Sequence, residues 1–410
     1  MTVALRRSFR AILSVLFLDN LGLTVVYPIF TPLVLKPIYT LLPIEYPLST
    51  RLILLAVLIA SFPFAQFLSG PFIGHLADIK GRKFALTLAL IGEGIGFLLT
   101  GLAILQMNYL FLLFGRVFTG FFAGNMTICL SSISDMQRGS QGRSKNFGIV
   151  SSVVGISFVV AIVIGGTLSN DTLNAFFNSA LPFWALTFFS LINLTIIRLR
   201  FTETHASSPN EKHYFRNQLR ELTSLFKTEQ LGSLYSLFFF FMLGWIVSLQ
   251  FLSSFLIEHF IGTKLAITLT FIGVGLSWCI GNMLINRLLI RYLRVGAILF
   301  YTLILSCVCL FVASETSHFL IFVHFILFGA LFASLSWTNC LALITSKAPP
   351  YLQGKLLGLN QSIATISMAF APLFGGMVGE FDIRTIYLFA SCSLLISTLI
   401  LIIYKIKNRF

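Results

Sequence analysis

Long apolar runs alternate with short polar segments along the whole chain. A helix needs about 20 apolar residues to cross the roughly 30 Å of hydrocarbon in a bilayer. Twelve runs reach that length, and they lie at 10–32, 52–74, 84–106, 109–133, 146–168, 179–198, 231–257, 265–286, 296–314, 318–343, 354–377 and 384–405. This pattern predicts an all-α membrane protein with twelve transmembrane helices.

Composition strengthens this interpretation and excludes several classes of function. Hydrophobic residues make up 57% of the chain and charged residues 10%, with a mean hydropathy of +0.92, which is too apolar for a soluble protein. The net charge of +14 does not indicate a nucleic-acid partner, because the basic residues form separate short clusters. The six cysteines lie inside apolar runs without metal-site spacing, so we expect no metal and no cofactor.

The basic residues also predict an orientation. If successive loops lie on alternate sides of the membrane, 23 of the 28 lysines and arginines fall on one side and four on the other. Basic loops remain in the cytoplasm. Both termini are therefore expected to be cytoplasmic, and an even number of helices follows.

The only long polar segment, 199–230, divides the chain into halves. We expect an N-terminal six-helix bundle at 1–198, a cytoplasmic linker at 199–230 and a C-terminal six-helix bundle at 231–410. A shift of 210 residues lays Gly148 on Gly358, Gly165 on Gly375 and Gly166 on Gly376. Small residues at recurring positions let helices pack closely, so the two bundles are expected to be pseudo-symmetric.

The segment between the second and third runs is dense in glycine and charge. It reads Gly-His-Leu-Ala-Asp-Ile-Lys-Gly-Arg-Lys from Gly74 to Lys83, and we expect a loop with glycine hinges at both ends. The pattern resembles the loop between helices 2 and 3 of the major facilitator superfamily, apart from Ile79, where the family usually carries a base. The resemblance implies a cytoplasmic gate at Gly74, Asp78, Gly81, Arg82 and Lys83, with Arg138, Arg143 and the region of Lys355 as partners of Asp78.

Three ionisable residues lie inside apolar runs, and buried charge in a membrane indicates function. Asp19 with Gly22 and Pro28 resembles the first helix of the tetracycline and multidrug proton antiporters, a branch of the superfamily. A carboxylate in a partly dry cavity holds a proton more firmly than in water, so Asp19 is the first candidate for the proton carrier. The alternative is that Asp19 stays ionised against Arg116 and only joins two helices.

Arg116, with Leu112, Gly120 and Ala123, resembles the helix 4 motif of the same family, which implies a role for Arg116 in proton coupling. Glu93 could pair with Arg116 or carry a proton and stay neutral, and a structural role is its alternative. The Gly-Pro of the antiporter helix 5 signature is missing, because residues 161–166 read Ala-Ile-Val-Ile-Gly-Gly. This departure counts against antiport but not against the fold.

The family resemblance implies a substrate cavity at mid-membrane between the halves. Aromatic and amide side chains in the relevant runs suit a sizeable amphipathic ligand. The candidates are Asn20, Tyr27, Asn125, Trp245, Gln250, His324, Trp337 and Asn339, with Gln66, Trp278, Asn282, Asn360 and Gln361 nearby.

These observations together predict a secondary transporter that exports a small amphipathic organic compound, a drug or a metabolite, in exchange for protons. The alternatives are proton symport that imports a small solute, and a membrane sensor or scaffold that transports nothing. No nucleophile with a base and no phosphate-binding loop is recognisable, so neither an enzyme nor ATP as the energy source is expected. We expect a monomer in the bilayer of a bacterial inner membrane, with a small molecule and protons as its partners.

Overall fold

The computed structural model describes residues 3–36, 38–135, 140–203, 229–260, 262–346 and 353–408, and every regular element in those ranges is a helix. The chain divides into two compact units. Unit 1 comprises residues 1–29, 39–41 and 61–220, and unit 2 comprises residues 30–38, 42–60 and 221–410. The predicted domain boundaries at 198 and 230 stay a prediction, and most of the linker, from residue 204 to 228, lies outside the described residues.

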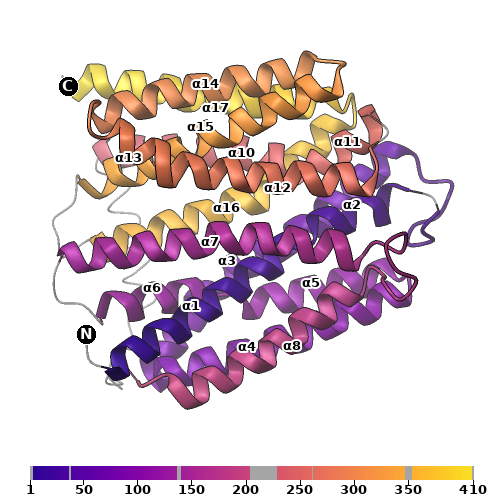
Figure 1. Cartoon of the computed structure of the whole chain (residues 1–410), viewed down its shortest axis with the longest axis horizontal. Coiled ribbons are helices and arrows are strands. Elements are labelled where there is room, and N and C mark those ends of the chain that lie inside the picture. The colour runs from indigo at the N-terminus through magenta and orange to yellow at the C-terminus, as the bar shows by residue number, and fades with distance from the viewer. Residues whose placement is uncertain are drawn as a thin grey trace. The chain divides into compact units, whose positions relative to one another are not determined.

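Unit 1 is built on α4, which packs against both α5 and α8, while α1 packs against α6, α7 and α8. Figure 1 shows α1, α4 and α8 as neighbouring ribbons. Glycines bring α4 and α5 together, because a Cβ on Gly96 would run into Thr119 and one on Gly115 would lie 2.9 Å from the Thr100 hydroxyl. The helices are α1 (Val3–Thr24), the start of α2 (Tyr27–Leu35), the second half of α3 (Leu48–Lys80), α4 (Arg82–Leu105), α5 (Tyr109–Phe122), α6 (Asn125–Asp135), α7 (Ser140–Leu168) and α8 (Leu181–Arg200).

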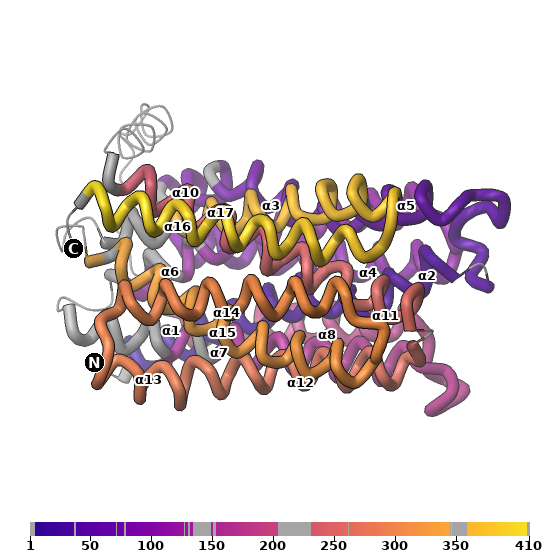
Figure 2. The backbone as a smooth tube through the Cα atoms, turned by 90° about the horizontal axis from the view of Figure 1, so that it is seen from above, coloured from indigo at the N-terminus to yellow at the C-terminus, as the bar shows by residue number. Residues whose placement is uncertain are grey.

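Unit 2 is organised around α14, α15 and α17, which run alongside one another in both Figure 1 and Figure 2. α10 packs on α16 and α17, and α12 packs on α15. The end of α2 and the first half of α3 also belong to this unit. Its other helices are α10 (Glu229–Gln250), α11 (Leu252–Phe260), α12 (Lys264–Ile280), the π-helical turn η1 (Gly281–Ile285), α13 (Asn286–Leu289), α14 (Val295–Glu315), α15 (Phe319–Ser346), α16 (Gln353–Gly379) and α17 (Arg384–Asn408).

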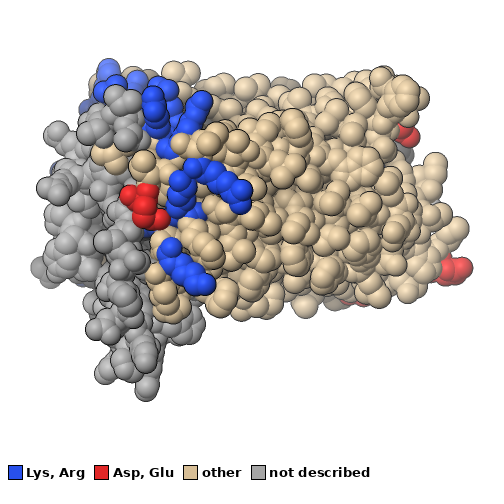
Figure 3. All heavy atoms as spheres, turned by 90° about the horizontal axis from the view of Figure 1, so that it is seen from below, with Lys and Arg blue, Asp and Glu red and all other residues tan. Residues whose placement is uncertain are grey.

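Length and apolarity qualify ten helical stretches of the described residues as membrane spans, and Tyr109–Phe122 and Val153–Leu168 are shorter apolar helices. The membrane-protein class predicted from the sequence is therefore confirmed. Figure 3 shows Lys and Arg side chains gathered toward one end of the face that it draws, while most of that face carries no charge.

Three of the expected continuous helices are broken, and one of them is the run 231–257, which forms α10 and α11 on either side of Phe251. The run 10–32 forms α1 and α2, which are separated at Val25 and Val26, and the run 109–133 forms α5 and α6, which are separated at Ala123 and Gly124. Proline lacks an N–H and its ring crowds the preceding turn, so Pro28 cannot continue α1 and instead sits in the first turn of α2. Apolarity gave no sign of these three breaks, because all of them lie inside hydrophobic sequence.

The expectation of a loop from Gly74 to Lys83 is wrong. Gly74 lies inside α3, which stays helical through Lys80, and a Cβ on Gly74 would meet nothing within 4 Å. Only Gly81 separates α3 from α4, and its φ of 91° is in the left-handed region that favours glycine. The hinge is therefore one residue at Gly81 and not a pair of glycines.

Arg51 holds the connection between α2 and α3 in unit 2. Its side chain is 3% exposed, and its guanidinium donates to the carbonyl oxygens of Tyr46 (3.1 Å), Val34 (2.8 Å) and Pro43 (2.6 Å). Three acceptors, one at the end of α2 and two in the following turn, satisfy most of the donors of a buried arginine. Arg51 therefore binds the end of α2 and the following turn to the start of α3.

Candidate functional site

A buried polar cluster in unit 1 joins Asp19 of α1, Glu93 of α4 and Asn125 of α6. The Asn125 amide nitrogen donates to Asp19 Oδ1 at 3.1 Å and to Glu93 Oε1 at 2.6 Å. Asp19 is 7% exposed, and Glu93 and Asn125 are fully buried. Two carboxyl groups from separate helices thus share one donor inside the protein, and we call these three residues the carboxyl cluster.

The break between α5 and α6 places Asn125 in this cluster. Asn125 is the first residue of α6, and α6 contacts both α1 and α4. The Gln66 amide nitrogen donates to the Ala123 carbonyl at 2.7 Å, which satisfies an acceptor at the end of α5. A Cβ on Gly124 would lie 3.3 to 3.5 Å from Ile73, Ser69 and Gly70 of α3, so the break also packs against α3.

Glycines beside the two carboxylates let aromatic rings approach the helices. A Cβ on Gly22 would lie 2.5 Å from Phe97 Cζ, and a Cβ on Gly92 would run into the Phe122 ring. Gly22 is three residues from Asp19, and Phe97 is four residues from Glu93, so each lies about one helical turn from its carboxylate. The rings of Phe97 and Phe122 therefore pack against α1 and α4 close in sequence to the two carboxylates.

Arg116 of α5 is the third ionisable group predicted from the sequence, and it is 1% exposed. Its Nη1 donates to the Gly22 carbonyl at 3.3 Å, and its guanidinium carbon lies 4.5 Å from the centre of the Phe62 ring. Arg116 therefore reaches α1 one turn from Asp19, whose own hydrogen bond comes from Asn125.

The chemistry open to the carboxyl cluster is the binding and release of protons. Asp19 Oδ2 and Glu93 Oε2 are buried and accept no hydrogen bond from any described residue. A buried carboxylate without enough donors is costly, and a proton lowers that cost by removing the charge. The sequence singled out all three ionisable residues, but the role of Asn125 as the bridge between two of them is new.

Unit 2 contains a tryptophan ladder, defined by Trp245 of α10, Trp278 of α12 and Trp337 of α15. The Trp245 and Trp278 rings are stacked with centroids 5.7 Å apart, and the Trp278 and Trp337 centroids are 6.5 Å apart. Trp245 is buried, whereas the other two are partly exposed. The structure thus unites two predicted cavity residues with Trp278, which the sequence placed only in their vicinity.

Neutral amides accompany the ladder. The Asn339 amide nitrogen donates to Asn286 Oδ1 at 2.7 Å, and Thr338 and Asn282 are hydrogen-bonded to each other. Asn282 lies in the turn η1, where a Cβ on Gly281 would lie 2.8 Å from the Leu331 carbonyl oxygen of α15. Such π-helical turns are frequent at functional sites.

The remaining cavity candidates belong neither to the carboxyl cluster nor to the tryptophan ladder. The Asn20 amide bonds to the Leu16 carbonyl of its own helix, and the Gln250 amide donates to the Met368 carbonyl of α16. His324 is exposed, with Nδ1 2.6 Å from the Leu320 carbonyl. Tyr27 is buried at the start of α2. Their roles in a cavity stay a prediction.

The gate motif has an anchor that sequence reasoning missed. Glu203, which follows α8, accepts from the backbone nitrogens of Arg82 (3.1 Å) and Lys83 (3.0 Å) at the start of α4. A carboxylate satisfies free N–H groups at a helix N-terminus and complements the helix dipole. No signal in the sequence relates residue 203 to residue 82. The side chains of Asp78, Arg143 and Lys355 and all of Arg138 lie outside the described residues.

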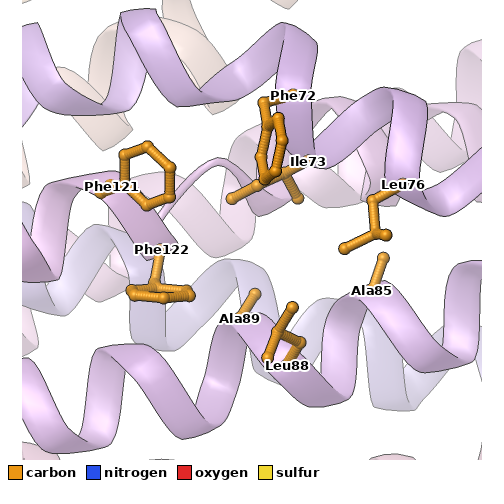
Figure 4. A pocket seen from close by; sticks show the side chains of 8 residues that line it. All are labelled: Phe72, Ile73, Leu76, Ala85, Leu88, Ala89, Phe121 and Phe122. Carbon is orange, nitrogen blue, oxygen red and sulfur yellow. The ribbon is translucent and has the colours of Figure 1, made fainter.

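An apolar pocket lies beside the carboxyl cluster, between α3, α4 and α5. Figure 4 shows Phe72, Phe121 and Phe122 on one side of it and Leu88 and Ala89 on another. Ile73, Leu76 and Ala85 complete the lining. The pocket offers no polar side chain for recognition, so it is an apolar recess and not a chemical site.

The comparisons with known proteins agree with the fold. The family model described as Major Facilitator Superfamily matches residues 12–322 and 234–409. The chain is 23% identical over 400 residues to multidrug resistance protein 1 of Bacillus subtilis, covering 96% of this chain and 95% of that protein. It is 28% identical over 167 residues to the class H tetracycline resistance protein of Pasteurella multocida, covering 40% and 38% of the two chains.

Solved structures show the same fold at low identity. The human organic anion transporter MFSD10 superposes with a TM-score of 0.73 and 18% identity, covering 98% of this chain and all of that one. A D-xylose-proton symporter superposes with a TM-score of 0.76 and 12% identity, covering 98% and 97%. The chain therefore belongs to the major facilitator superfamily and is a membrane transporter, not an enzyme.

Proposed function

We propose that this transporter exports a small amphipathic organic compound in exchange for protons. The observation that carries the proposal is the carboxyl cluster, in which two buried carboxyl groups meet at one amide donor. A buried carboxyl group that alternates between charged and neutral forms can couple substrate movement to a proton gradient. The relatives named for multidrug and tetracycline resistance support export as the direction.

Asp19 is the proposed proton carrier, and Arg116 is proposed to favour release of its proton. Arg116 contacts α1 at the Gly22 carbonyl, so a shift between α1 and α5 changes the distance between the cation and Asp19. Opposite charge nearby favours the ionised carboxylate. The tryptophan ladder supplies flat apolar surface and the neighbouring amides supply hydrogen bonds, which suits an aromatic or amphipathic substrate.

Import by proton symport is the second candidate. The helix 5 signature of the antiporters lacks its Gly-Pro in this chain, where Ala161 and Ile162 stand instead. The same carboxyl cluster serves either direction, because the sign of coupling depends on which states move across the membrane. We also propose that the chain crosses a bacterial inner membrane twelve times, has both termini in the cytoplasm and functions as a monomer.

The test is proton movement in vesicles that contain the purified protein and a pH-sensitive dye. Acid-loaded vesicles receive a panel of amphipathic drugs and metabolites from outside, with wild type compared with Asp19→Asn. We expect substrate-dependent loss of protons from the lumen in wild type and none in Asp19→Asn. The matched control is Glu45→Gln, which removes an exposed carboxylate in the connection before α3.

Protons that move in the same direction as the substrate would replace export with symport. No substrate-dependent proton movement across the panel would favour a sensor or scaffold. The gate is tested separately with Asp78→Asn, which we expect to cut transport while the protein still folds. Full transport by that variant would remove Asp78 from the mechanism.

A further inference from the structure

The carboxyl cluster contains two carboxyl groups, whereas a single proton carrier needs only one. One Asn125 nitrogen serves both carboxyl groups, so Asp19 Oδ1 and Glu93 Oε1 are no further apart than its two hydrogen bonds laid end to end. Two ionised carboxylates held this close repel each other, and one proton on the pair removes the repulsion.

Charge balance gives the same number of protons. Asp19, Glu93 and Arg116 are all at least nine-tenths buried, and a net charge in an apolar interior is strongly unfavourable. With both carboxyl groups ionised the three side chains sum to one negative charge, and with both protonated they sum to one positive charge. One proton on the two carboxyl groups makes the group neutral.

We propose that Asp19 and Glu93 bind one proton between them, and that Asn125 is the positioning residue that holds the two carboxyl groups in this shared state. The inference rests on the proposed function and assigns Glu93 to the proton-binding unit beside Asp19. Such a pair gains and loses protons as a unit, so neither residue acts alone. The balance is simple: the pair releases one proton to water and gains one negative charge, without any bond to carbon changing.

The other ionisable groups around the pair are few among the described residues. Cys129 of α6 is buried and lies one turn beyond Asn125. Arg116 approaches from α5 through the Gly22 carbonyl, and Arg82 lies at the start of α4. A buried thiol stays neutral near neutral pH, so Arg116 is the charge that balances the pair.

Infrared spectroscopy of the purified full chain tests the proposal with protons as the only ligand. The carbonyl band of a protonated, buried carboxylic acid is followed through steps of pH, without any substrate. We expect wild type to show this band at pH 7 with the intensity of one group. The variants Asp19→Asn and Glu93→Gln keep the shape of the side chain, and we expect the band to vanish in both, since the remaining carboxylate alone balances Arg116.

Each other pattern overturns the shared proton. A band that persists in Glu93→Gln leaves Asp19 as a lone carrier, and a band that persists in Asp19→Asn makes Glu93 a permanently neutral group. No band in wild type at pH 7 means that both groups are ionised, and a band with the intensity of two groups means that both are protonated. Glu45→Gln, the exposed control, should leave the spectrum unchanged.

Asn125 is tested by the pH at which the band disappears. Asn125→Leu removes the donor to the ionised form, so the band should persist to a pH about one unit or more higher. Asn125→Ser keeps one hydroxyl donor, so its band should disappear at a pH between those of wild type and Asn125→Leu. If Asn125→Leu does not fold, Asn125→Ser provides the test. An unchanged disappearance pH in either folded variant removes Asn125 from the proposal.

The vesicle transport assay distinguishes failure of this inference from failure of the proposed function. Absence of substrate-driven proton movement in the wild type ends the export proposal, yet leaves the infrared result untouched. Where the wild type does exchange protons for substrate, Glu93→Gln should lose proton movement as completely as Asp19→Asn. Retained proton coupling in Glu93→Gln contradicts the shared proton even where export is confirmed.

Discussion

Each unit buries an asparagine that donates to a polar side chain of another helix, and the acceptors differ in one respect. In unit 1, Asn125 donates to the carboxyl groups of Asp19 and Glu93. In unit 2, Asn339 donates to the amide oxygen of Asn286. An amide keeps its donors and acceptors at every pH, whereas a carboxyl group gains and loses one with its proton. The difference supports the proposal that protons act in unit 1, while the amides of unit 2 keep their polarity at every pH.

The largest expected effect is on Arg116, the buried cation that contacts α1 one turn from Asp19. Arg116→Gln leaves the carboxyl pair without a nearby positive charge, so the pair should retain its protons and transport should fall at least about tenfold in the vesicle assay. Arg116→Lys should not restore it, because an ammonium group cannot lie flat over the Phe62 ring while it donates to the Gly22 carbonyl. Transport at the wild-type rate in Arg116→Gln would place the coupling elsewhere.

The neutral pair of unit 2 should affect stability without affecting pH dependence. Asn339→Leu leaves Asn286 Oδ1 without this donor, at a cost of about 1–3 kcal/mol in the free energy of unfolding. Thermal unfolding in detergent should show the same loss at pH 6 and pH 8. The matched variant in unit 1, Asn125→Leu, should show a loss that changes between those values. A pH-dependent loss in Asn339→Leu would erase the contrast between the two units.

A smaller effect is expected at the tryptophan ladder. Trp337→Phe keeps an aromatic ring but removes part of the surface at 6.5 Å from Trp278. Aromatic pairs contribute about 0.5–1.5 kcal/mol beyond their burial, so the apparent affinity for an aromatic substrate should fall about two- to tenfold with little change in maximal rate. Tyr292→Phe, on an exposed side chain, is the control. An unchanged KM would exclude Trp337 from substrate binding.

The smallest effect is expected at an exposed carboxylate. Glu203→Gln keeps an oxygen that can accept from the backbone of Arg82 and Lys83 but loses the charge at the N-terminus of α4. The free energy of unfolding should fall by about 0.3–1 kcal/mol. This loss should be smaller in high salt, because salt screens exposed charges. Thermal unfolding at two salt concentrations measures it. A salt-independent loss would show that geometry and not charge is what Glu203 provides.

The sequence predicted the membrane class and most of the spans because about 20 apolar residues in succession are a strong signal. It did not predict where a span breaks. Gly124 lies in apolar sequence, and its close packing against α3 depends on residues more than 50 positions away. The prediction of a hinge at Gly74 was also wrong, since Gly74 lies inside α3. The sequence alone does not distinguish a glycine within a long helix from a glycine at a hinge.

The candidate site shows the same limit. Asp19, Glu93 and Arg116 stand out in the sequence because charge is rare in apolar runs. Their grouping does not, since Asn125 is 106 residues from Asp19 and 32 from Glu93. An asparagine in a membrane helix has many ordinary roles, and only the packing of α6 between α1 and α4 shows that this one bridges two acids.

Arg51 acts in one way during membrane insertion and in another way in the folded protein. In the unfolded chain it is one of four basic residues on the expected outer side, where positive charge opposes the proposed orientation. In the folded chain three carbonyl groups surround it, and no charge is left at the surface. A lysine at this position would present the same charge during biogenesis but would lack the planar fork that reaches several carbonyls. Orientation and folding are therefore separable at this residue: one depends on its charge, the other on its shape.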